Sequence, residues 1–280
     1  MDNTKLKNRM SSKIQTLQKP VEVIEVAETE MVPVKSDYLA LNNNALDIIK
    51  ENLKHQPLSF QLFDIVKSPS GGSTVFSVPG LAGEEAEKEL VGIILDYMTP
   101  RAYWSTPDPV EGTPPDCLSH DSIMSCDGKV CARCPYNDFG SKDGETGSKA
   151  CKESVLLFLL RQDNILPLLV RVPVTSKYRF LKYMTRLIGT MTPVTGVVTR
   201  ITLEKATSKT GKPFALFNFE AVSLLSPEET AMAKAFGQQF MENINFNEGA
   251  AESKLYHSAI LLLVFFILTG IMRDKTCHAV

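Results

Sequence analysis

The chain has 280 residues, of which 44% are hydrophobic, and its formal net charge is −2. This is enough for one large or two small domains with a buried core, and it excludes a mini-protein held together by disulfides. The charge is unevenly distributed: residues 171–212 hold nine bases and one acid, whereas residues 220–252 hold six acids and one base. This asymmetry favours binding of a polyanion by the middle of the chain.

The N-terminal segment, residues 1–55, has no apolar run typical of a secretory signal. We therefore expect a cytoplasmic protein whose cysteines stay reduced, so that a cysteine cluster indicates a metal site rather than disulfides. Within this arm, LNNNALDIIKENLKHQ predicts a short helix.

The next segments predict β structure. Two strands around a Ser-Pro-Ser-Gly-Gly turn are expected in LSFQLFDIVKSPSGGSTVFSVP, and a further β-rich run in KELVGIILDYMTPRAYWS. Four prolines in TPDPVEGTPPDC exclude regular structure there and predict a loop that leads into the cysteines.

Beyond the cysteines, ILPLLVRVPV predicts a buried strand and TSKYRFLKYMTRLIG an amphipathic helix. The apolar residues of that helix recur at helical spacing: Phe180, Leu181, Met184, Leu187 and Ile188. Alternation over residues 197–204 predicts a two-faced strand, and SKTGKP a hairpin turn. Ser226, Pro227 and Glu229 form a capping box that predicts a final helix.

The cysteine spacing predicts a structural metal site. Cys131 and Cys134 are two residues apart and can reach one ion from a tight turn, while Cys117 and Cys151 can complete a tetrahedron. Cys126 or His120 could replace Cys117, and a redox pair or unrelated buried thiols are the alternative interpretations. Four thiolates suit zinc, our first choice, or an iron–sulfur cluster. Without an adjacent acid–base arrangement for catalysis, we predict a protein that is not an enzyme.

The chain resembles single-stranded DNA-binding proteins encoded by phages and mobile elements of bacteria. The similar segments, within about residues 60–245, are PDCLSHD, CARCPYNDFGS, GSKACKE, LPLLVRVPVTS and the hairpin TPVTGVVTRITLEKATSKTGKPFALFNFEAVSLL. The resemblance implies an α+β, mainly β fold: an oligonucleotide-binding (OB) barrel with a zinc loop inserted at 114–153 and flanking helices. The domains expected are an arm at 1–55, the OB-like domain at 56–245, and an acidic linker with an apolar tail at 246–280.

Carried onto this chain, the resemblance implies four zinc ligands: Cys117, Cys131, Cys134 and Cys151. Sequence-independent binding of a single strand also requires cations that contact phosphates and rings on which bases stack. The candidate cations are Arg171, Lys177, Arg179, Lys182, Arg186, Arg200, Lys205, Lys209 and Lys212. The candidate rings are Tyr97, Tyr103, Trp104, Phe217 and Phe219, although aromatic residues in strands are more often part of a core.

An uncharged apolar segment, residues 256–272, follows the acidic region. As a helix it would reach about 26 Å, short of the roughly 30 Å hydrocarbon layer, so membrane association is an alternative to a buried helix. The leading hypothesis is a single-stranded DNA-binding protein with a structural zinc, acting in replication or recombination of a phage or mobile element. The acidic region could contact proteins of those processes. The alternatives are an iron–sulfur nuclease or helicase accessory protein and a membrane-tethered adaptor.

Overall fold

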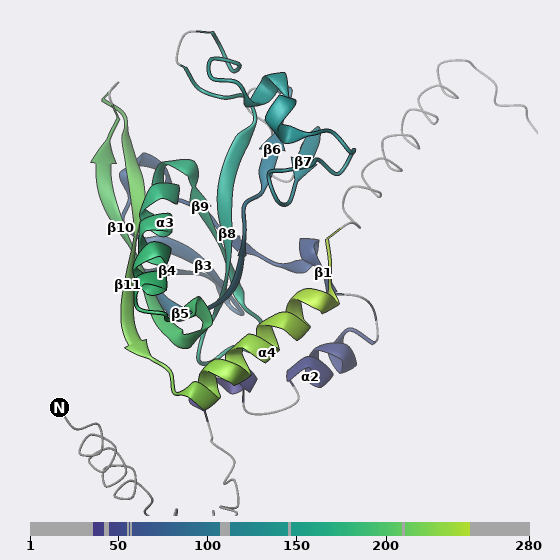
Figure 1. The fold of residues 1–280 in the computed structure, drawn as a ribbon, viewed down its shortest axis with the longest axis vertical. Coiled ribbons are helices and arrows are strands. Elements are labelled where there is room, and N and C mark those ends of the chain that lie inside the picture. Colours follow the sequence, from purple (N-terminus) through teal and green to yellow (C-terminus); the bar gives the residue numbers. More distant parts are fainter. Residues whose placement is uncertain are drawn as a thin grey trace, which may run out of the picture. The chain divides into compact units, whose positions relative to one another are not determined.

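The structure, a computed structural model, describes residues 36–41, 45–54, 56, 58–106, 113–144, 147–208 and 211–246. These residues form a mixed α+β fold, mainly β, with an eight-stranded sheet that does not close into a barrel within them (Figure 1). The strands of this sheet are β2 (Ile65–Val66), β5 (Glu89–Met98), β6 (Arg101–Tyr103), β7 (Cys117–Ser119), β8 (Lys152–Leu160), β9 (Leu168–Pro173), β10 (Val197–Thr207) and β11 (Pro213–Leu224).

The pairing of these strands is antiparallel except for β2 with β9. Along the sheet the order is β11, β10, β5, β8 and β9, and β6 and β7 extend it from the first residues of β8. Two smaller pairs lie outside it: β1 (Leu58–Ser59) with β12 (Ile244–Asn245), and β3 (Phe76–Gly80) with β4 (Gly83–Glu87). The described α-helices are α2 (Ala45–Asn52), α3 (Val174–Gly189) and α4 (Pro227–Asn243).

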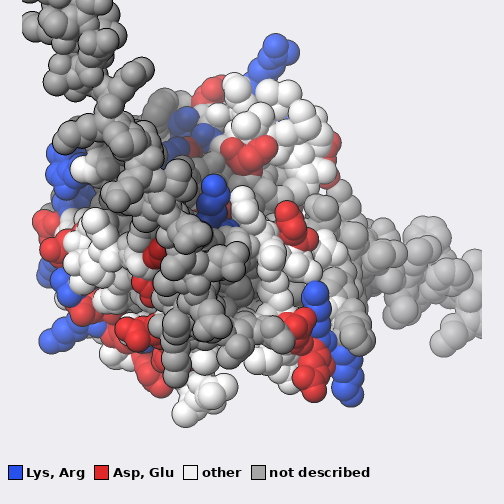
Figure 2. Space-filling model, turned by 60° about the horizontal axis from the view of Figure 1, so that its bottom comes forward, with Lys and Arg blue, Asp and Glu red and all other residues white. Residues whose placement is uncertain are grey.

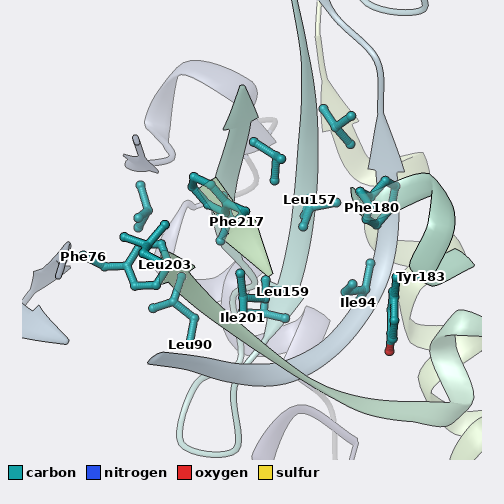
Figure 3. Packing of buried hydrophobic residues seen from close by; sticks show 14 of the residues in the cluster. Phe76, Leu90, Ile94, Leu157, Leu159, Phe180, Tyr183, Ile201, Leu203 and Phe217 are labelled. Carbon is teal, nitrogen blue, oxygen red and sulfur yellow. The ribbon is translucent and has the colours of Figure 1, made fainter. Parts of the chain in front are cut away.

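β8 is the centre of the fold because it is buried on both faces. Val155, Leu157 and Leu159 belong to the core that the curled sheet encloses with α3, where Phe180 and Phe217 also pack (Figure 3). The alternate residues of β8 pack instead into a second core with α2 and α4. Each fully buried Leu or Phe contributes about 1.5–3 kcal/mol, so this strand joins two separate stabilising layers.

Helix α3 connects β9 to β10 and spans the open side of the sheet. The Ser176 hydroxyl accepts a hydrogen bond from the Phe217 backbone N–H of β11 at 3.0 Å. Further along α3, the Tyr183 and Thr199 hydroxyls are 2.8 Å apart. The outer edge of β9 pairs with β2. Among the described residues β9 and β11 do not pair, which leaves a gap between these two strands. Helix α3 contacts both of them.

Most predicted elements are confirmed. The capping box of α4 is present, and Val197, Thr199, Ile201 and Leu203 alternate inward along β10 as the pattern predicts. Gly71 and Gly72, with φ of 64° and 70°, make the predicted turn, since only glycine adopts such angles freely. The flanking strands β2 and β3 do not pair with each other, however, but with β9 and β4.

Two parts of the sequence interpretation were wrong or incomplete. Leu181 and Ile188 were predicted on the buried face of α3, but they are 43% and 70% exposed, and Tyr183 is buried instead. Strand β8 was not predicted, although its continuous run VLLFLL is typical of a strand buried on both faces.

The remaining predictions concern the ends of the chain. The predicted helix of the N-terminal arm is α2, whose Ala45 and Ile49 are buried in the second core. The apolar segment 256–272 lies outside the described residues. Among the residues that are described, no helix is both long and apolar enough to cross a membrane.

Candidate metal centre and nucleic-acid interface

Four cysteines from separate parts of the chain line one small cavity. Cys117 comes from β7, Cys131 and Cys134 from a tight turn, and Cys151 directly precedes β8. The cavity has a volume of about 30 Å³. A cavity of this volume has room for a small occupant such as a metal ion. The cysteine loop, defined as residues 117–151, thus brings together the four thiols that the sequence predicts.

Backbone hydrogen bonds determine the path of the cysteine loop around this cavity. The Cys134 N–H donates to the Cys131 carbonyl at 3.3 Å, which closes the short turn between these two thiols. The Cys151 N–H donates to the Tyr136 carbonyl at 2.8 Å and joins the end of the loop to that turn. Gly128, with φ of 77°, allows the reversal that brings Met124 opposite Val130. The loop is therefore ordered by polar contacts rather than by an apolar core.

The thiols influence one another electrostatically. Burial raises the pKa of the Cys117 thiol; a hydrogen bond with Ser125 and the charge of Lys129 oppose this shift, and the neighbouring Cys134 adds to it. Burial also raises the pKa of Cys151; Arg101 opposes this effect, and the other three thiols reinforce it. A bound metal ion would favour the thiolate form of each cysteine that ligates it.

The donor chemistry at the cavity fits a structural zinc ion. Four thiols leave no ligand position for a substrate, which is typical of structural rather than catalytic sites. In the part of the chain that the structure describes, no three or more His, Cys, Asp or Glu side chains form a ready-made ion-binding group. The shared cavity is therefore the observation that makes these thiols candidate ligands.

Polar side chains connect the cavity wall to the sheet. Arg101, which lines the cavity from β6, donates to Asn137 and, at 2.7 Å, to Glu153. Both side chains of the Arg101–Glu153 pair are more than four-fifths buried. Lys177 of α3 also donates to Glu153. These contacts link the cysteine loop to the start of β8 and to α3.

The two alternative ligands do not line the cavity. Cys126 is exposed, on the hairpin that joins Met124 to Val130. The His120 ring lies 5.6 Å from that of Phe246, and its buried Nε2 has no hydrogen-bond partner among the described residues. Burial lowers the pKa of His120, and the nearby Asp121 opposes this shift. Neither residue replaces Cys117 in this arrangement.

The predicted stacking rings occupy very different surroundings. Phe217 was a wrong choice for base contact because it is fully buried beside Phe76. Phe219 is half-buried and stacks on Tyr183, while Tyr97 meets Phe180 edge-on. Phe217 and Phe219 belong to the core that α3 covers, whereas Tyr97 is 36% exposed.

The other two rings lie next to the cysteine loop. Tyr103 stacks on Tyr136, with ring centroids 4.0 Å apart, and its hydrogen bond with Tyr136 raises the Tyr103 pKa. Trp104 is half-buried and donates from its indole N–H to the Thr113 carbonyl at 3.0 Å. Tyr103 and Trp104 therefore remain candidates for contact with a ligand.

The predicted cations do not all face solvent as free charges. Lys177 pairs with Glu153, Arg179 with Glu204, and Arg200 with both Glu89 and Glu220. On one side of the molecule, acidic and basic side chains are interspersed (Figure 2). Acidic residues distant in sequence thus neutralise part of the basic segment.

Two of the predicted cations, Arg171 and Lys209, are not described as exposed charges. The Arg171 guanidinium has a buried Nε without a hydrogen-bond partner among the described residues, and burial lowers its pKa. Arg171 is therefore poorly placed to contact a phosphate. Lys209 lies outside the described residues. Four cations are exposed and form no ion pair with a described residue: Lys182, Arg186, Lys205 and Lys212.

The sequence interpretation missed an exposed ring on α3. Tyr178 is 74% exposed on α3, and Lys182 and Arg186 follow it at intervals of four residues. Side chains at this spacing lie on one helix face, which we call the α3 ridge (Tyr178, Lys182 and Arg186). Helix α3 contains no acidic residue. The i, i+4, i+8 spacing was the signal that could have identified Tyr178.

Comparison with known proteins identified no relative of this chain. No protein-family model, no curated protein and no solved structure matches the chain.

Proposed function

We propose that this protein binds single-stranded DNA without sequence preference, is not an enzyme, and is stabilised by a structural zinc ion. The observation that carries the proposal is the order of five strands. β5, β8 and β9 form a meander, α3 follows, and the β10–β11 hairpin returns to pair with β5. This order supports assigning these strands to the OB fold, a five-stranded, partly open Greek-key barrel that binds oligonucleotides.

The charge arrangement supports the same function. The α3 ridge places a tyrosine and two cations on one exposed face without an acidic neighbour on the helix, and Lys205 and Lys212 extend from the β10–β11 hairpin. Cations that contact the backbone and rings on which bases stack are the two requirements for binding a single strand. We propose the α3 ridge and this hairpin as the phosphate-contacting surface.

The metal is proposed to be one zinc ion held by Cys117, Cys131, Cys134 and Cys151. Four thiols around one small cavity are the ligand set of a structural zinc site, our first choice, and an iron–sulfur cluster takes the same four thiolates. The bound metal would hold the cysteine loop to the sheet. Metal analysis and colour distinguish the two: zinc protein is colourless, and brown protein purified without air would support the iron–sulfur accessory protein instead.

The cellular setting is part of the proposal. By its resemblance to proteins of phages and mobile elements, the chain would act in replication or recombination of such an element, in the cytoplasm of a bacterial host. The acidic region 242–252, most of which lies outside the described residues, would contact other proteins of that process.

A binding titration tests the function. Labelled oligo-dT and a duplex of equal length are titrated with the full chain at several salt concentrations, and anisotropy is measured. We expect tighter binding to the single strand and a linear fall of log K with log salt, because binding releases counterions. Equal affinity for both, or affinity independent of salt, would contradict the proposal.

A further inference from the structure

The cysteine loop holds two aromatic rings at its surface. Phe139 is 82% exposed and Tyr136 is 44% exposed, and they are three residues apart. Single exposed apolar residues are common, but two neighbouring rings on a polar loop require an explanation. Neither ring is needed to fill either hydrophobic core.

Each ring is supported from one side. The Lys149 ammonium lies 4.4 Å from the centroid of the Phe139 ring, a cation–π contact. Lys149 also donates to the Asn137 side chain at 3.1 Å, which orients the ammonium. Tyr136 stacks on Tyr103 with an interplanar angle of 14°. The surface therefore combines flat rings, held in place, with an adjacent positive charge.

The position of this surface depends on the thiol cavity. Tyr103 and Tyr136 line the cavity together with the four cysteines. The Tyr136 carbonyl accepts from the Cys151 N–H at 2.8 Å and from the Ser141 hydroxyl at 2.9 Å. The Asn137 N–H donates to the Cys134 carbonyl at 2.9 Å. A metal ion that fixes Cys134 and Cys151 would fix the backbone that carries the rings.

We propose that Tyr136, Phe139 and Lys149 form a base-stacking platform for single-stranded nucleic acid, positioned by the metal centre. This inference rests on the proposed function and adds a second contact surface to the α3 ridge. Bases stack on the two rings, and the Lys149 ammonium offsets the charge of a nearby phosphate. The bound strand would thus contact the loop that holds the metal as well as the sheet domain.

The test is an oligo-dT titration of the zinc-loaded full chain with matched variants at Phe139. Phe139→Tyr keeps the ring and should bind as the wild type does. Phe139→Leu keeps the apolar character but removes the ring, and it should bind about fivefold more weakly or worse. Leu81→Ala, at a fully exposed apolar position in the β3–β4 turn, serves as the control and should bind normally. Equal affinity of Phe139→Leu and wild type would overturn the inference.

Metal removal supplies a second measurement. Chelation of the metal should lower the affinity of the wild type for oligo-dT. It should change the affinity of Phe139→Leu much less, since the platform contributes little to binding by that variant. Equal losses in both proteins would contradict the coupling between cavity and rings.

The outcomes separate the two proposals. If the wild type does not bind oligo-dT, the proposed function and the platform both fail. If the wild type binds and an Arg186→Ala change weakens binding while Phe139→Leu does not, only the platform fails.

Discussion

The sheet and the cysteine loop are joined by β8, but different interactions hold them. Val155–Leu160 are buried on both faces of β8, whereas the described buried residues of the loop are Ser119, Ser125, Cys131 and Cys151. Apolar burial stabilises by about 25 cal/mol per Å², and the loop has little such area. The sheet should therefore fold by its own packing, while the loop needs hydrogen bonds and the proposed ion.

The largest expected effect is a loss of folding stability caused by a change in the sheet. A Cβ at Gly92 of β5 would lie 2.3 Å from the Leu160 carbonyl oxygen of β8. Because this neighbour is backbone, Gly92→Ala should destabilise the protein by about 3 kcal/mol. Denaturant unfolding measures the change. Gly189→Ala at the end of α3 is the matched control, since its Cβ would meet nothing within 4 Å, and its stability should equal or exceed that of the wild type.

The next largest effect is expected in the cysteine loop, which should lose its metal and its order while the sheet stays folded. Cys134→Ser removes one of the four proposed ligands and should abolish stoichiometric zinc, because a three-thiolate site is incomplete. Hydrogen exchange should quicken throughout the cysteine loop, while the amides of Val155–Leu160 stay protected. Cys126→Ser, at an exposed cysteine away from the cavity, should keep one zinc ion per chain. Loss of zinc in both variants would show that the ligand set is wrong.

A smaller effect, on DNA binding, is expected from the exposed cations of α3. Replacing both Lys182 and Arg186 by alanine should weaken oligo-dT binding and flatten its salt dependence, by about 0.7 in slope for each lost phosphate contact. Zinc content should not change. Lys234→Ala, an exposed base on α4, should leave the slope unaltered. A slope that falls equally in both proteins would contradict an interface on α3.

The smallest expected effect is a loss of folding stability on removing the N-cap of α4. The Ser226 hydroxyl accepts from the Glu229 N–H at 3.1 Å, so Ser226→Ala should cost about 1 kcal/mol of folding stability. Thermal unfolding measures this loss. Unchanged zinc content would be consistent with independent support of sheet and loop, whereas loss of zinc would contradict it.

Local patterns in the sequence predicted much of the fold. Helical spacing and a capping box predicted α3 and α4, and alternation predicted the two distinct faces of β10. The cysteine spacing identified the four thiols that line the cavity. These features are readable because helix periodicity, caps and tight turns depend on residues within a few positions of one another.

The sequence by itself thus determined the types of most elements and the thiol set, and tertiary structure decided which side chains are available. Phe217 is buried because α3 covers the curled sheet, and Arg179 is paired because Glu204 lies across from it. The sheet stays open within the described residues, where the short strand β2 pairs with the edge of β9. Burial, ion pairing and strand order arise from contacts between residues far apart in the chain, which periodicity and spacing do not encode.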